Sequence, residues 1–196
     1  TATQAPSAAT QTTDASGNAD WKVTFGALTN RATVNVSETM QDGYEFLSGE
    51  CTVTGLDGSE TETTLTGPDA TALTDVAPGD QVNCTYTNKP TPGSITVAKK
   101  DATDQSTLAD AVFQLWNDVN GNGTLEPTID TTVGAAQTTP DTGVAEWQDL
   151  PLGKYLVQEV TPPPGYDLTS PAVKAFEVKT TDRTLTYVFE NPRKPG

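Results

Sequence analysis

The sequence contains no histidine among its 196 residues, which removes the commonest general base and the commonest zinc ligand from its chemistry. We therefore expect no conventional enzyme. Basic residues are also scarce, because 11 Lys and Arg stand against 26 Asp and Glu, for a net charge of −15. Nucleic acids and anionic membranes attract basic surfaces, so this charge argues against both as partners. No apolar run could cross a bilayer and no signal peptide opens the sequence, which predicts a mature or excised soluble segment.

Cysteine is nearly absent too, with only Cys51 and Cys84 in the chain. Each lies in a strand-like segment, ECTVTG or QVNCTYTN, and their spacing is not that of a close metal-binding pair. We favour a disulfide over two buried free thiols. A disulfide would place the protein outside the cytosol.

What the sequence does contain is typical of an all-β protein. Threonine, glycine, proline, valine and alanine dominate, charged residues make up 19%, and no helical periodicity persists. The length suits two modules. The proline-rich stretch TNKPTPGS reads as a linker between a module over residues 1–90 and a second over 91–196. The polar residues 1–20 read as a linker or an edge strand.

The second half repeats the first. Strand-like segments WKVTF, RATVNVSE, GYEFL, ECTVTG, ETETTLTG and QVNCTYTN fill the first half, and DWKVTF…VNVSE…GYEFL corresponds to EWQDL…LVQEV…GYDL in the second. Both halves close on an asparagine after an aromatic strand. We predict an internal duplication of one β-sandwich module. The first copy lacks an opening strand, since its first twenty residues contain no lysine and nothing like ITVAKKD.

Three polar residues of the second copy fall on strand faces that are otherwise apolar. Strand alternation turns Lys99, Glu159 and Asn191 inward together with their apolar neighbours. A neutral polar group buried without a partner costs roughly 2–7 kcal/mol, so we infer that the three meet. Glu38 and Asn88 are the counterparts of Glu159 and Asn191 in the first copy.

The segments GSITVAKKD, LADAVFQLW and GVAEWQDLPLGKYLVQEVTPPPGYDL resemble the SpaA-type, collagen-adhesin B-type (CnaB) modules of Gram-positive surface adhesins and pilins. Asp110 departs from the pattern, because that family usually has glycine there. The resemblance implies an Ig-like, prealbumin-like β-sandwich on the bacterial cell surface. It also implies a spontaneous isopeptide bond between Lys99 and Asn191, promoted by Glu159.

The physical chemistry of burial agrees with that implication. Burial disfavours the ammonium form, so Lys99 can present a neutral amine, while the Glu159 carboxyl can hydrogen-bond the Asn191 carbonyl and relay protons as ammonia leaves. Such a reaction turns over once within one molecule and is not enzymatic. The alternative is a buried ion pair between Lys99 and Glu159 with Asn191 hydrogen-bonded beside it.

We expect a spacer in a stalk or pilus of a secreted or cell-wall-attached protein, with neighbouring modules of the same protein as partners. One alternative is an adhesive ligand-binding module, for which the tryptophans Trp21, Trp116 and Trp147 are candidates. The absent first strand also has two explanations. The chain was cut inside the module, which we favour, or another polypeptide supplies the strand and is captured covalently at Asn88.

One loop has metal-ligand spacing. Oxygen-bearing side chains alternate along WNDVNGNGTLEPTID, and the candidate calcium ligands are Asp118, Asn120, Asn122, Thr124, Glu126 and Asp130. Ile129 occupies the twelfth position, which excludes an EF-hand. Two hypotheses remain, a looser calcium loop or an Asn/Gly-rich hairpin turn that needs no ion. No cofactor is required by the rest of the sequence.

Overall fold

The computed structural model describes residues 10–168 and 171–195, and within them the regular structure is entirely β-strand. The chain divides into two compact units. One comprises the described residues up to Gln41 together with Glu45–Lys89, and the other comprises Asp42–Tyr44 and the described residues from Pro90 on. Residues 1–9 of the predicted N-terminal linker lie outside the described part. Within that part no helix has the length and apolar character needed to span a bilayer.

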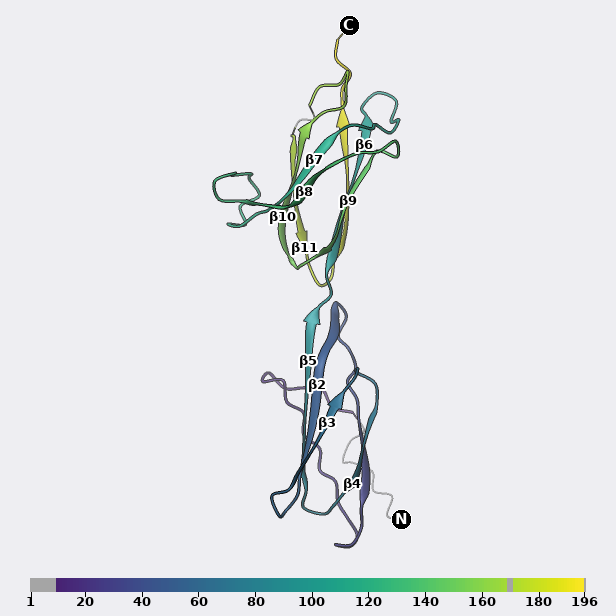
Figure 1. Ribbon diagram of the computed structural model, residues 1–196, viewed down its shortest axis with the longest axis vertical. Helices are drawn as coiled ribbons and strands as arrows, with labels where there is room; N and C mark the ends of the chain where they lie inside the picture. Colours follow the sequence, from purple (N-terminus) through teal and green to yellow (C-terminus); the bar gives the residue numbers. More distant parts are fainter. Residues whose placement is uncertain (1–9, 169–170, 196) are drawn as a thin grey trace. The chain divides into compact units, whose positions relative to one another are not determined.

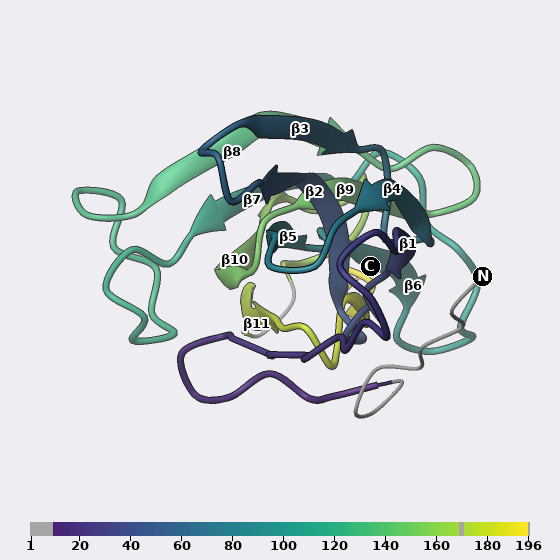
Figure 2. The same cartoon turned by 90° about the horizontal axis from the view of Figure 1, so that it is seen from below.

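The first unit contains two small sheets. Strand β1 pairs with β4, as Figure 2 shows, while β2 lies between β3 and β5 in the other sheet. The strands are β1 (Ala32–Val36), β2 (Tyr44–Thr54), β3 (Glu60–Leu65), β4 (Thr71–Val76) and β5 (Gln81–Pro90). The described residues before β1 form no strand.

A disulfide joins the two longest strands of the first unit. Cys51 of β2 and Cys84 of β5 are bonded, which confirms the predicted pairing. Cys51 is fully buried and packs in a small apolar core that includes Leu65 and Leu73. Half-buried residues surround these, so a covalent bond supplements a core that buries little apolar surface.

The second unit is a two-layer sandwich, visible in Figure 1. One sheet has the order β11-β10-β7-β8, and the other has β12-β6-β9. The strands are β6 (Gly93–Asp101), β7 (Val112–Asn117), β8 (Thr131–Thr138), β9 (Val144–Leu150), β10 (Gly153–Thr161), β11 (Val173–Val178) and β12 (Thr184–Asn191).

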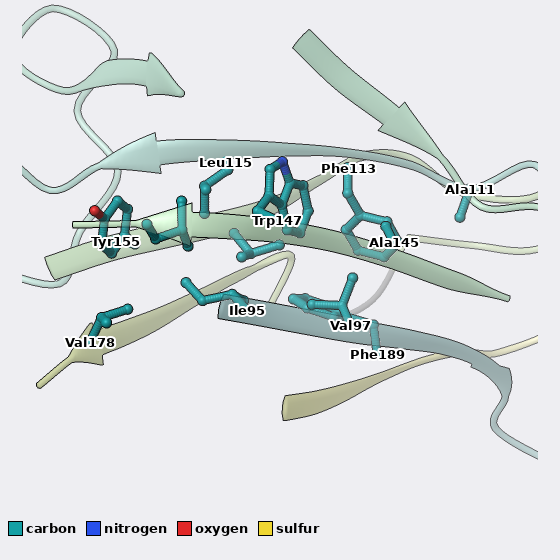
Figure 3. Packing of buried hydrophobic residues seen from close by; sticks show 12 residues of the cluster. Ile95, Val97, Ala111, Phe113, Leu115, Ala145, Trp147, Tyr155, Val178 and Phe189 are labelled. Atoms are coloured by element: carbon teal, nitrogen blue, oxygen red, sulfur yellow. The ribbon is translucent and has the colours of Figure 1, made fainter. Parts of the chain in front are cut away.

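Strict alternation along β6 builds the core of this sandwich. Ile95 and Val97 are fully buried, and their side chains meet Trp147 of β9 and Phe189 of β12 between the layers (Figure 3). Strand β6 is central in its sheet because it pairs antiparallel with β9 and parallel with β12. The residue after Lys99 on the inward face of β6 is Asp101, which is also fully buried.

The departure from the family pattern at Asp110 has a conformational consequence. Asp110 has a φ of 63°, which lies in the left-handed region that favours glycine. Aspartate tolerates this region better than most residues do, so the turn keeps its shape without glycine.

Several sequence predictions about individual strands are wrong. The segment WKVTF forms no strand, and Trp21 is 46% exposed, whereas its counterpart Trp147 is 6% exposed. The predicted GYEFL and ECTVTG strands are one continuous strand, β2. The linker is only Thr91 and Pro92, because β5 continues to Pro90 and β6 begins at Gly93. Strands β4, β8 and β11 were not predicted.

The disulfide generates a prediction about stability. Because it closes a loop with a sequence separation of 33, the double variant Cys51→Ser/Cys84→Ser should lower the unfolding free energy of the first unit by roughly 3–4 kcal/mol. Calorimetry should show the transition of this unit moving to lower temperature. The transition of the second unit is the internal control, and a variant in which neither transition moves would contradict the assigned role.

Candidate site for a covalent cross-link

Lys99 projects from the central strand β6 into the dry interior of the second unit. Its side chain is fully buried, as strand alternation after Ile95 and Val97 requires. In the parallel pairing of β6 with β12, Lys99 lies opposite Phe189. The Lys99 Nζ donates a hydrogen bond of 2.9 Å to the Phe189 carbonyl oxygen, so the amine is drawn toward β12.

Glu159 and Asn191 complete the cluster from two other strands. Glu159 lies on β10 in the facing sheet, and its Oε1 is 3.8 Å from the Lys99 Nζ. The Asn191 Nδ2, on β12, donates a hydrogen bond of 2.7 Å to the same Oε1. The structure thus brings together the three residues predicted from the sequence. The Asn191 amide nitrogen, rather than the carbonyl oxygen expected from the sequence, is hydrogen-bonded to Glu159.

Aromatic rings enclose this cluster. Phe113 pairs with Glu159 in the β7–β10 register, and its ring centroid lies 5.0 Å from that of Phe189. Both rings are buried. Burial in these surroundings lowers the pKa of Lys99 to about 8, although the charge of Glu159 opposes the shift. The shift favours the neutral amine, which is the nucleophilic form.

A second polar cluster lies two residues beyond the first along the same strands. The buried Asp101 carboxylate accepts hydrogen bonds from the Thr103 backbone N–H at 2.7 Å, the Tyr166 hydroxyl at 2.8 Å and the Arg193 Nε at 2.6 Å. The Thr103 N–H, followed by Arg193 and Tyr166, holds the pKa of Asp101 well below its usual range. The sequence analysis missed this cluster. The inward position of Asp101 in ITVAKKD was the available signal.

The first unit carries a partial counterpart of the cross-link site. The Asn88 Nδ2 on β5 donates a hydrogen bond of 2.8 Å to the Glu38 Oε1, which lies just after β1. Three buried atoms here have no hydrogen-bond partner among the described residues, namely Glu38 Oε2, Asn88 Oδ1 and the Tyr86 hydroxyl oxygen. Burial and the nearby Glu38 charge raise the pKa of Tyr86.

The loop proposed for calcium is organised by its own hydrogen bonds. Asp118 accepts from the backbone N–H groups of Asn122 and Gly123, and Asp130 accepts from those of Val119 and Glu126. The Glu126 carboxylate accepts from the side-chain amides of Asn120 and Asn122, and Asn122 Oδ1 accepts from the Thr124 N–H. Across residues 10–168 and 171–195, no three His, Cys, Asp or Glu side chains are grouped as a metal site.

Family comparisons agree with this architecture. The SpaA model, described as a prealbumin-like fold domain, matches residues 93–193, and a related SpaA-type model with the same description matches residues 1–90. The chain belongs to the SpaA family of prealbumin-like domains. The predicted fold class, an all-β chain of two tandem prealbumin-like modules, is confirmed. Among curated proteins the chain has no match.

The chain is also similar, at low identity, to several solved structures. The Bacillus anthracis TIE protein is 18% identical with a TM-score of 0.45, over 83% of this chain and 34% of that protein. The group B streptococcus pilus 2b backbone protein is 16% identical with a TM-score of 0.46, over 82% and 84% of the two chains. The full-length major pilin SpaD from Corynebacterium diphtheriae is 16% identical with a TM-score of 0.43, over 84% and 61%. The chain thus spans about a third of the first of these proteins.

The lowered pKa of Lys99 predicts how stability depends on pH when no cross-link can form. In an Asn191→Ala variant the folded pKa of about 8 lies below the ordinary value of 10.5, so the unfolded chain binds more protons between these values. Stability should therefore rise with pH across this window, by on the order of 2 kcal/mol after allowance for screening. Denaturant unfolding between pH 7 and 10 measures the rise.

The matched control is Lys99→Met in the same Asn191→Ala background, which keeps the side-chain volume and removes the titrating group. Tyrosines and surface lysines titrate equally in both variants, so they cancel in the difference. Equal pH slopes in the two variants would refute the pKa shift.

Proposed function

We propose that this chain is a structural segment of the stalk or pilus of a Gram-positive cell-surface protein, in which an amide bond between Lys99 and Asn191 closes the second unit. The observation that carries the proposal is the approach of both nitrogens to one buried oxygen of Glu159. The disulfide supports an oxidising, extracellular setting. Its partners are then the neighbouring modules of the parent protein.

The reaction needs only groups of this chain. The neutral Lys99 Nζ attacks the Asn191 Cγ, a carbon–nitrogen bond forms, and the bond from Cγ to Nδ2 breaks as ammonia leaves. The Glu159 carboxyl, which lies 3.8 Å from the Lys99 Nζ and accepts from the Asn191 Nδ2, relays the proton from the amine to the leaving nitrogen. The enclosure by Phe113 and Phe189 excludes water, and burial holds the reacting groups together.

The position of the bond suits a mechanical role. It would join β6 to β12, the first and last strands of the second unit, and tension along a chain of modules enters through those strands. With the cross-link in place, force would pass through covalent bonds rather than through the hydrogen bonds of the sheet. Closing the loop from residue 99 to residue 191 should also stabilise the unit by roughly 4–5 kcal/mol, if the entropy estimate for disulfides transfers.

The intact mass of the purified protein tests the bond directly. We expect the mass of the 196-residue sequence less one ammonia, and less two hydrogens for the disulfide. Reduction should restore only the two hydrogens. A digest should contain a branched peptide that joins the segment around Lys99 to the segment around Asn191.

Two variants serve as controls for the mass. Glu159→Ala should restore the ammonia because the proton relay is lost, and Lys99→Arg should restore it because the amine is lost. If Lys99 and Glu159 instead remain an unreacted ion pair, the protein of natural sequence should keep the ammonia. A full, ammonia-retaining mass in freshly prepared protein would reject the cross-link and favour that alternative.

A pulling experiment tests the mechanical role. Stretched in a single-molecule instrument, the natural protein should show no extension from the residues between 99 and 191, because the cross-link shunts the force. Asn191→Ala should release that length and should also be cleaved faster by proteases. Extension of the natural second unit at the same force as the variant would contradict a mechanical function even if the bond forms.

Two further hypotheses from the sequence remain predictions. Calcium binding would compete with the hydrogen bonds that the carboxylates of Asp118 and Asp130 already accept. A melting temperature that is equal in calcium and in chelator would favour the ion-free turn.

For the adhesive alternative, Trp147 packs in the core and is poorly placed to stack on a ligand.

A further inference from the structure

The polar cluster around Asp101 has no part in the proposed reaction, yet it lies beside the reacting groups. The Asp101 side chain is fully buried, and its donors come from three separate segments: the Thr103 backbone N–H, the Tyr166 hydroxyl and the Arg193 Nε. A buried carboxylate is costly unless donors surround it, so these segments are held together at the carboxylate. We call Asp101, Tyr166 and Arg193 the Asp101 network.

Each member of the Asp101 network follows one of the cross-link residues along the chain. On β6, Asp101 is the next inward residue after Lys99. Arg193 and Tyr166 come just beyond the ends of β12 and β10, the strands that carry the other two cross-link residues. The network therefore ties together the three segments that lead out of the reacting cluster.

The pairing of β12 with β6 decides where the Asn191 side chain points. In this pairing Asn191 lies opposite Asp101, and its carbonyl oxygen accepts a hydrogen bond of 3.0 Å from the Ala102 N–H. On the outer face of β12, the Gln105 side chain donates a 2.9 Å hydrogen bond to Glu190. A shift of one residue would turn Asn191 outward and Glu190 inward, because side chains alternate along a strand. The correct register is thus a condition of the reaction.

The Asp101 network opposes such a shift just beyond the end of β12. Strand β12 is at the edge of its sheet and pairs with β6 alone, so its register depends on a single neighbour. Arg193 is held there by two carboxylates, those of Asp101 and Asp104, each at 2.6 Å. Two backbone hydrogen bonds of 3.0 Å also join residues 165–167 to residues 192–194. The end of β12 is therefore fixed on both sides.

We propose that the Asp101 network is a positioning device for the cross-link, which fixes the register of β12 on β6 and so holds the Asn191 carboxamide beside the Lys99 amine. The inference rests on the reaction proposed for the second unit. It adds no chemical step to that reaction. Asp101, Tyr166 and Arg193 are positioning residues that act through the backbone of β12.

The charge of Asp101 has a second, electrostatic effect on the cluster. Burial lowers the pKa of the Lys99 amine, and three carboxylates, one each from β10, β12 and β6, oppose that shift: Glu159, Glu190 and Asp101. Replacing Asp101 with asparagine removes one of these negative charges, so the pKa of Lys99 should fall further. Tyr166→Phe, in contrast, removes a hydrogen bond of the network without removing a charge.

The rate of cross-linking in the folded protein tests the positioning role. The full chain is recovered unreacted in denaturant, refolded by dilution at a series of pH values and followed by intact mass as one ammonia is lost. Tyr166→Phe and Arg193→Met should each lower the plateau rate at high pH by roughly tenfold to a hundredfold, because small displacements of the reacting atoms slow a reaction that depends on proximity. Arg193→Lys, which keeps the charge, should recover part of the rate.

The dependence of the rate on pH separates position from charge. The natural chain should reach half of its plateau rate near pH 8, because the pKa of Lys99 is about 8. Asp101→Asn should lower the plateau rate and move this midpoint to lower pH, whereas Tyr166→Phe should lower the plateau rate alone. Residues that only stabilise the fold would change neither quantity once the unit is folded.

Two controls separate positioning from stability. Glu177→Gln breaks an exposed 2.8 Å ion pair with Lys179 in the same unit and should leave the rate unchanged. Each variant of the network is also made in a Lys99→Arg background, which cannot react, so that denaturant unfolding gives the folded fraction under the assay conditions. If Arg193→Met does not fold, Tyr166→Phe and Arg193→Lys decide the question.

Plateau rates equal to the natural value in folded Tyr166→Phe and Arg193→Met protein would overturn the inference and leave the cross-link itself standing. A loss of rate that only matches the unfolded fraction would overturn it as well, because the Asp101 network would then act on stability alone. If the natural chain loses no ammonia, the proposed function fails and this inference fails with it. The mass spectra therefore distinguish the two failures.

Discussion

The exclusion of water around Lys99 is the condition on which the second unit depends. An ammonium group in an apolar sandwich is unfavourable, and the surroundings respond by lowering the pKa of the amine and by placing a carboxylate and an amide against it. In the proposed reaction, the same burial that makes the unreacted cluster costly would also make the amine nucleophilic. The aromatic contact between Phe113 of β7 and Phe189 of β12 belongs to the core and would also shield the proposed reaction from water.

The two units differ in whether the described residues include a strand with a buried lysine, and their sheets and cores differ with it. Where β6 is present, it organises a three-stranded sheet and buries Trp147. Where no such strand is described, the equivalent tryptophan segment is irregular and the core shrinks to a few residues beside a disulfide. The disulfide between β2 and β5 restrains the strand that carries Asn88, whose side-chain amide donates a hydrogen bond to Glu38.

The alternation of side chains along a strand predicted the two strands that carry Lys99 and Glu159. It failed for segments whose structure depends on hydrogen bonds with a neighbouring strand. ITVAK and YLVQEV carry inward polar residues among apolar ones, a pattern that local sequence records directly. WKVTF has the same kind of pattern but forms no strand, because a strand also needs a hydrogen-bonding partner. Strands β4 and β8 are threonine-rich and only partly buried, so alternation gave little signal for them. The Asp101 cluster was missed because its arginine and tyrosine are remote in sequence.

The parallel pairing of β6 with β12 has a geometric consequence for the second unit. Two parallel strands at the start and end of a fold carry the chain in at one pole and out at the other, unlike the hairpin pairing that returns it to its point of entry. Such a unit adds its full length to the polypeptide that contains it. When such a unit is duplicated or deleted, the main change is therefore in the length that the polypeptide spans.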